Sequence, residues 1–184
     1  GDPSKKFILY TPIGNMYLRE NDVDRLVVDT LARFDATVLV RLPPTDVVSF
    51  GEDFRPPKNV VFYRPGVVAS NRQSAGAEAG RREMSAADDD HLLNSLAHAD
   101  VVVTGPSTII IDAALFDCPI ALVGFDGSRA RPYRESTLHY YDYPYMQPVM
   151  ETGGAWLTKS PAELAQAVTT YLANPGRDRA GRAE

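Results

Sequence analysis

The chain contains 184 residues, of which 44% are hydrophobic and 23% are charged, values typical of one globular domain with a substantial core. Its net charge of -5 leaves no overall basic field, so we expect no nucleic-acid partner. The single cysteine, Cys118, excludes an intrachain disulfide framework and indicates a reducing, cytoplasmic compartment. Because Cys118 precedes a proline and begins an apolar run, we expect a buried, unreactive thiol.

In chain order, short apolar runs rich in β-branched residues alternate with segments whose apolar residues recur at helical spacing. The runs predict strands at 7–10, 36–41, 60–63, 101–103, 120–123 and 155–157. The helical spacing predicts helices at 22–34, in a segment opened by Asp88, at 107–116 and at 161–172. This alternation predicts an α/β fold, a Rossmann-like three-layer αβα sandwich with a mainly parallel sheet of about six strands.

The same pattern predicts the domain organisation. Residues 1–6 lack a signal-peptide core and are expected to be a linker remnant. Residues 7–173 are expected to form one domain, with a flexible insertion near 69–87, where the chain becomes polar and rich in small residues. Residues 174–184 are expected to form a frayed tail. No apolar run reaches the roughly twenty residues that a membrane span requires.

The stretch from Asp100 to Asp112 carries the clearest functional signal. A buried-strand pattern ends at the turn Gly105-Pro106, and Ser107 stands where an N-cap residue belongs. The first amides of the following helix would favour a phosphate, and Asp112, about one turn further on, would lie within reach of a ribose. In the alternative interpretation this is an ordinary strand–turn–helix unit, with Ser107 only a cap and Asp112 only a solvated acid.

Other turns follow predicted strands, and in an open parallel sheet they would share the edge at which ligands bind. They are the segments 11–14, 104–107 and 124–127. Gly14 is a lone glycine rather than a Gly-x-Gly-x-x-Gly motif, so its own signal is weak. The acids 88–90 complement a helix dipole, and no metal site is expected there. His91 and His98 have no evident partners and receive no role.

The order of these parts resembles a known family. The run from Asp89 through Val101-Val102-Val103-Thr104-Gly105-Pro106-Ser107-Thr108, followed by Asp112-Ala113-Ala114, is similar to the C-terminal half of two-domain glycosyltransferases of the GT-B type. The segments 117–120 and 153–164 resemble the same family in their order and spacing. Nearest are the CDP-glycerol glycerophosphotransferase-like and surface-polysaccharide transferases, with UDP-GlcNAc 2-epimerases as cousins.

The resemblance implies a domain that binds the nucleotide diphosphate of an activated donor, a UDP-, GDP- or CDP-linked sugar or polyol, without a further cofactor or metal. It assigns phosphate binding to the turn after the 101–103 strand and ribose binding to the acid beyond it. The residues at these positions are Thr104, Gly105, Pro106, Ser107, Thr108 and Asp112. Further possible donor contacts are Gly14, Arg41, Gly124, Asp126, Arg131 and His139. A cation from the 129–134 loop would stabilise the leaving diphosphate.

One departure affects the choice of donor. The CDP-glycerol enzymes often carry Arg-x-His-Pro after the second strand, whereas this chain has Arg41-Leu42-Pro43-Pro44, with proline in place of the histidine. A sugar donor is therefore at least as well supported as glycerol phosphate.

The sequence contains no convincing general base, since no nucleophile–base–acid order and no paired carboxylates occur in one motif. The resemblance implies an acceptor-binding N-terminal domain, for which these residues have no room. Alone, the chain should bind nucleotide weakly and turn over little, and membrane contact would come only through the missing half. Two other classes stay open: half of a sugar-nucleotide epimerase, or a non-catalytic nucleotide-binding or assembly module.

Overall fold

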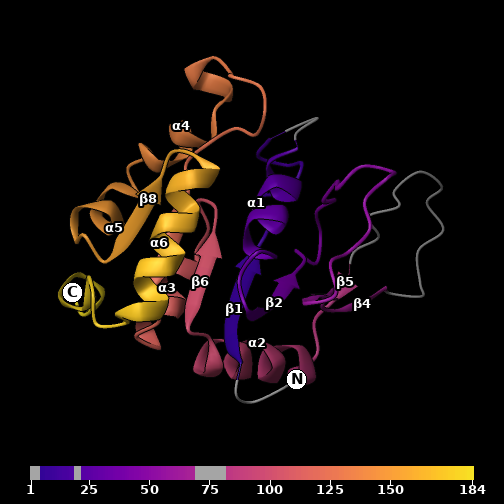
Figure 1. Ribbon diagram of the computed structural model, residues 1–184, viewed down its shortest axis with the longest axis horizontal. Coiled ribbons are helices and arrows are strands. Elements are labelled where there is room, and N and C mark those ends of the chain that lie inside the picture. The colour runs from indigo at the N-terminus through magenta and orange to yellow at the C-terminus, as the bar shows by residue number, and fades with distance from the viewer. Residues whose placement is uncertain (1–4, 19–21, 69–81) are drawn as a thin grey trace.

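Six parallel strands form the central sheet, in the order β3-β2-β1-β6-β7-β8 (Figure 1). The computed structural model describes residues 5–18, 22–68 and 82–184. The strands are β1 (Lys6–Thr11), β2 (Ala36–Arg41), β3 (Val60–Tyr63), β6 (Val101–Thr104), β7 (Ile120–Val123) and β8 (Ala155–Thr158). The prediction of a mainly parallel sheet of about six strands is confirmed.

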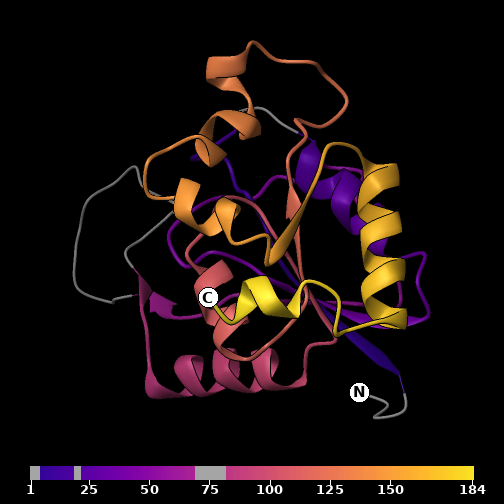
Figure 2. The ribbon, with the colours of Figure 1, turned by 90° about the vertical axis from the view of Figure 1, so that its left-hand side faces the viewer.

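Helices cover both faces of the sheet, which makes the three layers visible in Figure 2. One face is covered by α1 (Val23–Leu31) and α6 (Pro161–Ala173). The other face carries α2 (Ala86–His98), α3 (Ile109–Leu115), α4 (Thr137–Tyr141) and α5 (Gln147–Glu151). A 3-10 turn, η1 (Tyr133–Glu135), precedes α4. Within the described ranges, no helix has the length and apolarity needed to cross a bilayer.

The alternation of strand side chains divides the core into two clusters. Ile8 and Tyr10 pack with α1 and α6, whereas Leu9 packs with the helices of the opposite face, and all three side chains are fully buried. Successive side chains of a strand point to opposite faces, and both faces of this sheet are covered. This is why the strands appear in the sequence as unbroken apolar runs instead of alternating ones.

The region between β3 and α2 differs in detail from the prediction. A short antiparallel pair, β4 (Val67–Val68) and β5 (Arg82–Glu83), flanks part of the predicted 69–87 insertion, of which residues 69–81 lie outside the described residues. Helix α2 begins at Ala86 with Ser85 and Asp88 in a reciprocal capping box, so the helix start lies earlier than Asp88. Among the described residues no cluster of three or more His, Cys, Asp or Glu side chains is placed to hold a metal ion.

The C-terminal residues correct the expectation of a frayed tail. They form helix α7 (Arg179–Arg182), and Arg182 is buried at 6% exposure. Its Nε donates to Asp117 Oδ1 at 3.2 Å, while its Nη1 and Nη2 donate to the carbonyls of Arg177 and Pro175 at 2.7 and 2.9 Å. The buried Arg182 side chain, with three acceptors, anchors the tail to the turn before β7. Because Arg182 and Asp117 are 65 residues apart, local composition does not reveal their contact.

Substituting Gly181 with alanine is expected to undock α7 and to lower the free energy of unfolding by about 1–3 kcal/mol. An added Cβ at this glycine would overlap the Thr152 carbonyl oxygen and the Gly154 amide. The matched control is Gly176→Ala, whose Cβ would meet only the Asn174 side chain, at 3.5 Å. Urea unfolding and amide exchange of residues 177–184 would measure both effects. Equal stability of the two variants would contradict the docking described above.

Candidate functional site

The site lies where the direction of the chain across the sheet reverses. From β1 the chain passes through α1 to β2 on one side, and from β6 it passes through α3 to β7 on the other. Because β1 and β6 are neighbours, the segments that follow them diverge and leave a crevice at the carboxyl end of the sheet. Thr11 Oγ1 donates to Thr104 Oγ1 at 2.6 Å, which joins the two strand ends.

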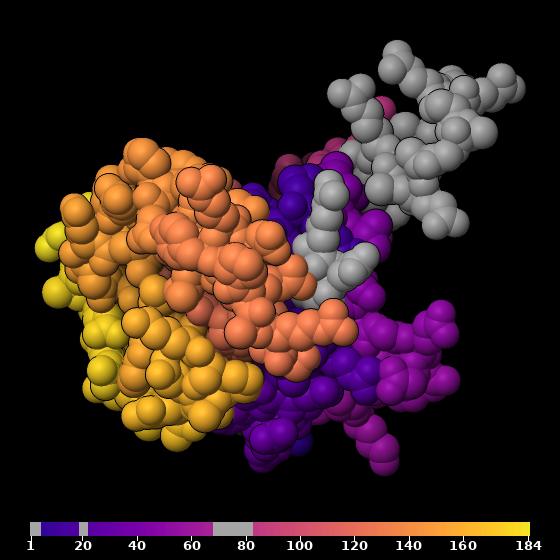
Figure 3. Space-filling view, turned by 90° about the horizontal axis from the view of Figure 1, so that it is seen from above, coloured from indigo at the N-terminus to yellow at the C-terminus, as the bar shows by residue number. Residues whose placement is uncertain are grey.

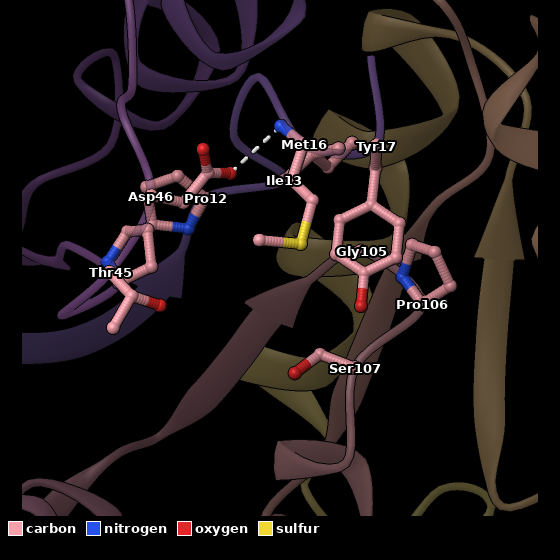
Figure 4. A pocket seen from close by; sticks show the side chains of 10 residues that line it. Pro12, Ile13, Met16, Tyr17, Thr45, Asp46, Gly105, Pro106 and Ser107 are labelled. Carbon is pink, nitrogen blue, oxygen red and sulfur yellow. Dashed lines mark hydrogen bonds between the residues drawn. The ribbon is translucent and has the colours of Figure 1, made fainter. Parts of the chain in front are cut away.

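The first part of this crevice, called chamber A, lies between the loops that follow β1 and β2 and the turn after β6 (Figure 4). Its volume is about 230 Å³. In Figure 4 the hydroxyls of Thr45 and Ser107 face the open space between these loops. The lining residues are Pro12, Ile13, Met16, Tyr17, Pro43, Thr45, Asp46, Gly105, Pro106 and Ser107.

The second part, chamber B, continues from chamber A towards α2 and α3, with a volume of about 270 Å³. Both chambers share Pro12, Pro43 and Ser107 in their linings, so they lie side by side, and together they are called the groove. Chamber B combines four side chains singled out from the sequence: Arg41, Ser107, Thr108 and Asp112. The other lining residues are Thr11, Pro12, Leu42, Pro43, Pro44, Pro65, Met84, Leu92 and Ile109.

Ser107 does not cap helix α3, contrary to the prediction. Helix α3 begins at Ile109, the N-cap position is occupied by Thr108 in helical conformation, and no side chain caps it. The first turn is closed by backbone bonds from Ile110 to Ser107 and from Ile111 to Thr108, so no hydroxyl is needed there. The Ser107 hydroxyl makes no hydrogen bond within the described part of the chain and faces both chambers.

The loop after β1 is held by a buried carboxylate that the sequence analysis did not single out. Asp24 of α1 is 0% exposed and accepts hydrogen bonds from the Tyr10 hydroxyl at 2.5 Å, the Ile13 amide at 2.8 Å and the Gly14 amide at 3.1 Å. Burial raises the pKa of Asp24, although these hydrogen bonds oppose the rise. The amides of Ile13 and Gly14 are therefore bonded to Asp24 and do not point towards a ligand.

Gly14 is a structural residue in this loop. It has φ +76°, and a Cβ here would overlap the Asp46 carboxylate. Asp46 in turn accepts from the Met16 amide at 3.0 Å, the hydrogen bond drawn in Figure 4. The Asn15 amide also donates to the Val47 carbonyl at 2.9 Å. These contacts join the β1–α1 loop to the β2–β3 loop and shape the mouth of chamber A, so Gly14 lies behind the chamber and not in its lining.

The remaining predicted donor contacts follow β7 and line neither chamber. Gly124 donates its amide to the Thr158 carbonyl at 2.8 Å. Asp126 Oδ1 accepts from the Ser136 hydroxyl and the Thr137 amide, at 3.0 and 2.7 Å, and so fixes the start of α4. His139 packs among Tyr133, Tyr140 and Tyr143, with ring centroids 5.0–5.8 Å away. Arg131 is half-buried in the loop between β7 and η1.

The segment after β7 contacts a lining residue of the groove through Tyr140. Figure 3, which looks onto the carboxyl end of the sheet, shows the segment in orange beside the indigo β1–α1 region. The rings of Tyr17 and Tyr140 make an edge-to-face contact at 5.0 Å, and the Tyr140 hydroxyl donates to the Tyr17 carbonyl at 3.3 Å. Tyr17 lines chamber A, so the α4 region supports the chamber wall from behind.

Several residues of the groove were missed by sequence reasoning, namely Met16, Tyr17, Thr45 and Asp46 in the lining and Asp24 behind it. Only Asp24 had a usable signal, since it lies on the same helical face as Val27, Val28 and Leu31, where an acid is out of place. The others belong to loops whose residues meet only in the folded chain.

Comparison with known proteins shows a shared fold at low sequence identity. No protein-family model and no curated protein sequence matches the chain. Among solved structures, the calicheamicin glycosyltransferase CalG4 has a TM-score of 0.56 and 17% identity, over 98% of this chain and 38% of that chain. Glycosyltransferase VinC in complex with DTDP has a TM-score of 0.55 and 18% identity, over 100% of this chain and 37% of that chain.

An epimerase shares the fold as well. The UDP-GlcNAc 2-epimerase from Methanocaldococcus jannaschii has a TM-score of 0.54 and 12% identity, over 97% of this chain and 44% of that chain. At these identities the likeness establishes the Rossmann-like fold. The chain spans less than half the length of each of these proteins.

Proposed function

We propose that this chain is the donor-nucleotide-binding domain of a glycosyltransferase-like enzyme that uses a nucleotide-activated sugar or polyol. The observation that carries the proposal is the groove at the β1–β6 reversal, in which Arg41, Ser107, Thr108 and Asp112 line one chamber. The fold shared with two glycosyltransferases and an epimerase supports it.

The lining suggests a role for each group. The hydroxyls of Ser107 and Thr108 donate to phosphate oxygens, with Gly105 and Pro106 in the chamber A lining and Thr104 buried beneath them, and the Asp112 carboxylate accepts from ribose hydroxyls. Helix α3 has only seven residues, so its dipole is a minor contribution, and the proposal depends on the side chains of the groove.

The donor itself is proposed to be a nucleotide-linked sugar or polyol used in surface-polysaccharide or teichoic-acid-type synthesis. Pro43, which replaces the histidine of the Arg-x-His-Pro pattern, lies in the wall shared by both chambers. An imidazole available to a glycerol phosphate is therefore replaced by an apolar ring, which favours a sugar donor over CDP-glycerol.

Acceptor binding and the general base are proposed to come from a second domain. The solved structures that share the fold are more than twice as long as the matched region, which supports a two-domain enzyme. A second candidate function is half of a sugar-nucleotide epimerase, favoured by the fold shared with the Methanocaldococcus jannaschii enzyme. Both use the groove for a nucleoside diphosphate and differ in what the partner domain adds.

Calorimetric titration with UDP, CDP, GDP, ADP and dTDP tests the proposal. We expect at least one diphosphate to bind, and Asp112→Ala to weaken that binding about tenfold because the ribose hydroxyls lose a charged acceptor. The matched control is Asp90→Ala, which removes an exposed acid of α2 that lines neither chamber. Absence of binding by all five diphosphates would contradict the proposal and favour a non-catalytic assembly module.

A further inference from the structure

The wall of chamber B contains a buried cation, Arg41. This residue ends β2 and is 6% exposed, yet it lines the chamber. The guanidinium interacts with uncharged groups: Nη1 donates to His91 Nδ1 at 2.9 Å, Nη2 donates to the Asp88 carbonyl at 3.0 Å, and the Tyr63 hydroxyl lies within its reach. None of the ion pairs formed among the described residues includes Arg41.

The nearest acid does not neutralise this cation directly. The Asp88 carboxylate is taken by the Tyr63 hydroxyl at 2.6 Å and by the Ser85 hydroxyl and amide at 2.7 and 2.9 Å. Asp88 and Asp89 act on Arg41 only through space, and burial lowers the pKa of the guanidinium, which nevertheless stays charged. A buried cation without a carboxylate partner is costly, and a bound anion would relieve that cost.

His91 fixes the direction of the guanidinium. Its ring stacks on Tyr63 with centroids 3.6 Å apart and planes 6° apart, while the guanidinium carbon of Arg41 lies 5.2 Å from the centre of the same Tyr63 ring. Burial, followed by the charge of Arg41, lowers the pKa of His91, so the imidazole is neutral and Nδ1 accepts from Nη1. Three elements, β2, β3 and α2, therefore hold one cation in one orientation.

The charge balance of the groove makes this cation distinctive. Among the lining residues that the structure describes, Arg41 is the one cation, and Asp46 and Asp112 are the acids. The Ser107 and Thr108 hydroxyls are neutral donors, so they can satisfy phosphate oxygens but supply no positive charge. A diphosphate carries more negative charge and more acceptor oxygens than a monophosphate, and it therefore gains more from Arg41.

We infer that Arg41, oriented by His91, binds the second phosphate of the ligand, so that the groove selects nucleoside diphosphates against the corresponding monophosphates. The inference rests on the proposed function. The inference assigns two further roles at the proposed site. Arg41 determines specificity, and His91 positions Arg41 and acts only through it.

The test compares the tightest-binding diphosphate with its own monophosphate by calorimetry. The unmodified chain is expected to favour the diphosphate at least tenfold, and Arg41→Gln to bring that ratio close to one by weakening diphosphate binding much more than monophosphate binding. His91→Phe keeps a ring against Tyr63 but removes the acceptor, and is expected to lower the ratio as Arg41→Gln does. His91→Asn supplies an amide oxygen as acceptor and is expected to retain much of the preference.

A double-mutant cycle shows whether His91 acts by positioning Arg41 or weakens diphosphate binding independently of it. Arg41→Gln combined with His91→Phe is expected to cost no more than Arg41→Gln alone, because His91 acts only through Arg41. Additive losses, or an unchanged ratio in Arg41→Gln, would overturn the inference. Absence of nucleotide binding by the unmodified chain would instead overturn the proposed function.

A measurement on the unmodified chain covers the case in which the variants do not fold. With arginine labelled by ¹⁵N, one protected side-chain Nε–H signal is expected to shift on adding the diphosphate and to stay in place on adding the monophosphate. Equal shifts with both ligands, or none with the diphosphate once calorimetry has shown that it binds, would overturn the inference.

Discussion

Replacing Asp24 with alanine is expected to lower the free energy of unfolding by about 3 kcal/mol. The fully buried carboxylate accepts from the Tyr10 hydroxyl and from the amides of Ile13 and Gly14. Alanine would leave these buried donors without acceptors, and each unsatisfied group costs about 1–3 kcal/mol. Chemical unfolding followed by circular dichroism measures the loss.

The matched control lies on the same helix. Asp29 is half-buried, and its carboxylate is 3.7 Å from Arg25 Nε, so Asp29→Ala is expected to cost less than about 0.5 kcal/mol. Similar losses in Asp24→Ala and Asp29→Ala would show that the inward carboxylate does not hold the β1–α1 loop.

The pH dependence of the same site has a definite sign. Burial raises the pKa of Asp24 above its value in the unfolded chain, about 3.9, so the folded state binds this proton more tightly. The stabilisation linked to that proton is complete below the unfolded pKa and is lost as the pH rises through the folded pKa. The stability of the unmodified chain relative to Asp24→Asn is therefore expected to increase as the pH is lowered from about 7 to about 4. A difference that stays constant would contradict the raised pKa.

Replacing Ser107 with leucine is expected to weaken nucleoside diphosphate binding by at least about 100-fold while changing the stability by less than about 0.5 kcal/mol. Ser107 lines both chambers, and its hydroxyl has no partner within the described ranges. A leucine side chain would extend into the groove where the two chambers join, not into packed core. Calorimetric titration and thermal unfolding of the same samples measure the two effects.

Ser49→Leu provides the comparison, since Ser49 is an exposed serine in the β2–β3 loop that lines neither chamber. This variant is expected to bind like the unmodified chain. Full binding by Ser107→Leu would place the ligand elsewhere and would remove the main support for the proposed function.

Local sequence patterns were sufficient to predict the layered architecture of this protein. The run Val101–Val103 predicts a strand buried on both faces, and all three side chains are fully buried in β6. The sequence Ser160-Pro161-Ala162-Glu163 predicts the start of α6, and the Ser160 hydroxyl accepts from the Glu163 amide at 3.1 Å, although the Glu163 carboxylate accepts from the Lys159 amide and not from that of Ser160. These features are determined within a few residues, because burial patterns and caps depend on side chains one turn or one strand apart.

The composition of the groove was only partly predictable. The alternation of strands and helices places Thr104, Ser107 and the loop after β1 at one edge of a parallel sheet, and the structure confirms that placement. The alternation does not reveal that the predicted contacts between residues 124 and 139 are absent from the lining. They are absent because Asp126 fixes the start of α4 and His139 packs among tyrosines.

What the sequence determined by itself is the six strands of the central sheet, the helices α1, α2, α3 and α6, and the edge of the sheet at which the groove lies. Only the tertiary structure decided that Arg41 meets His91 across 50 positions, that Asp24 turns inward beneath the β1–α1 loop, and that the tail docks through Arg182. The physical reason is that burial of a charge depends on which distant segments cover it. Local propensity carries no information about a partner that only the strand order brings within hydrogen-bonding distance.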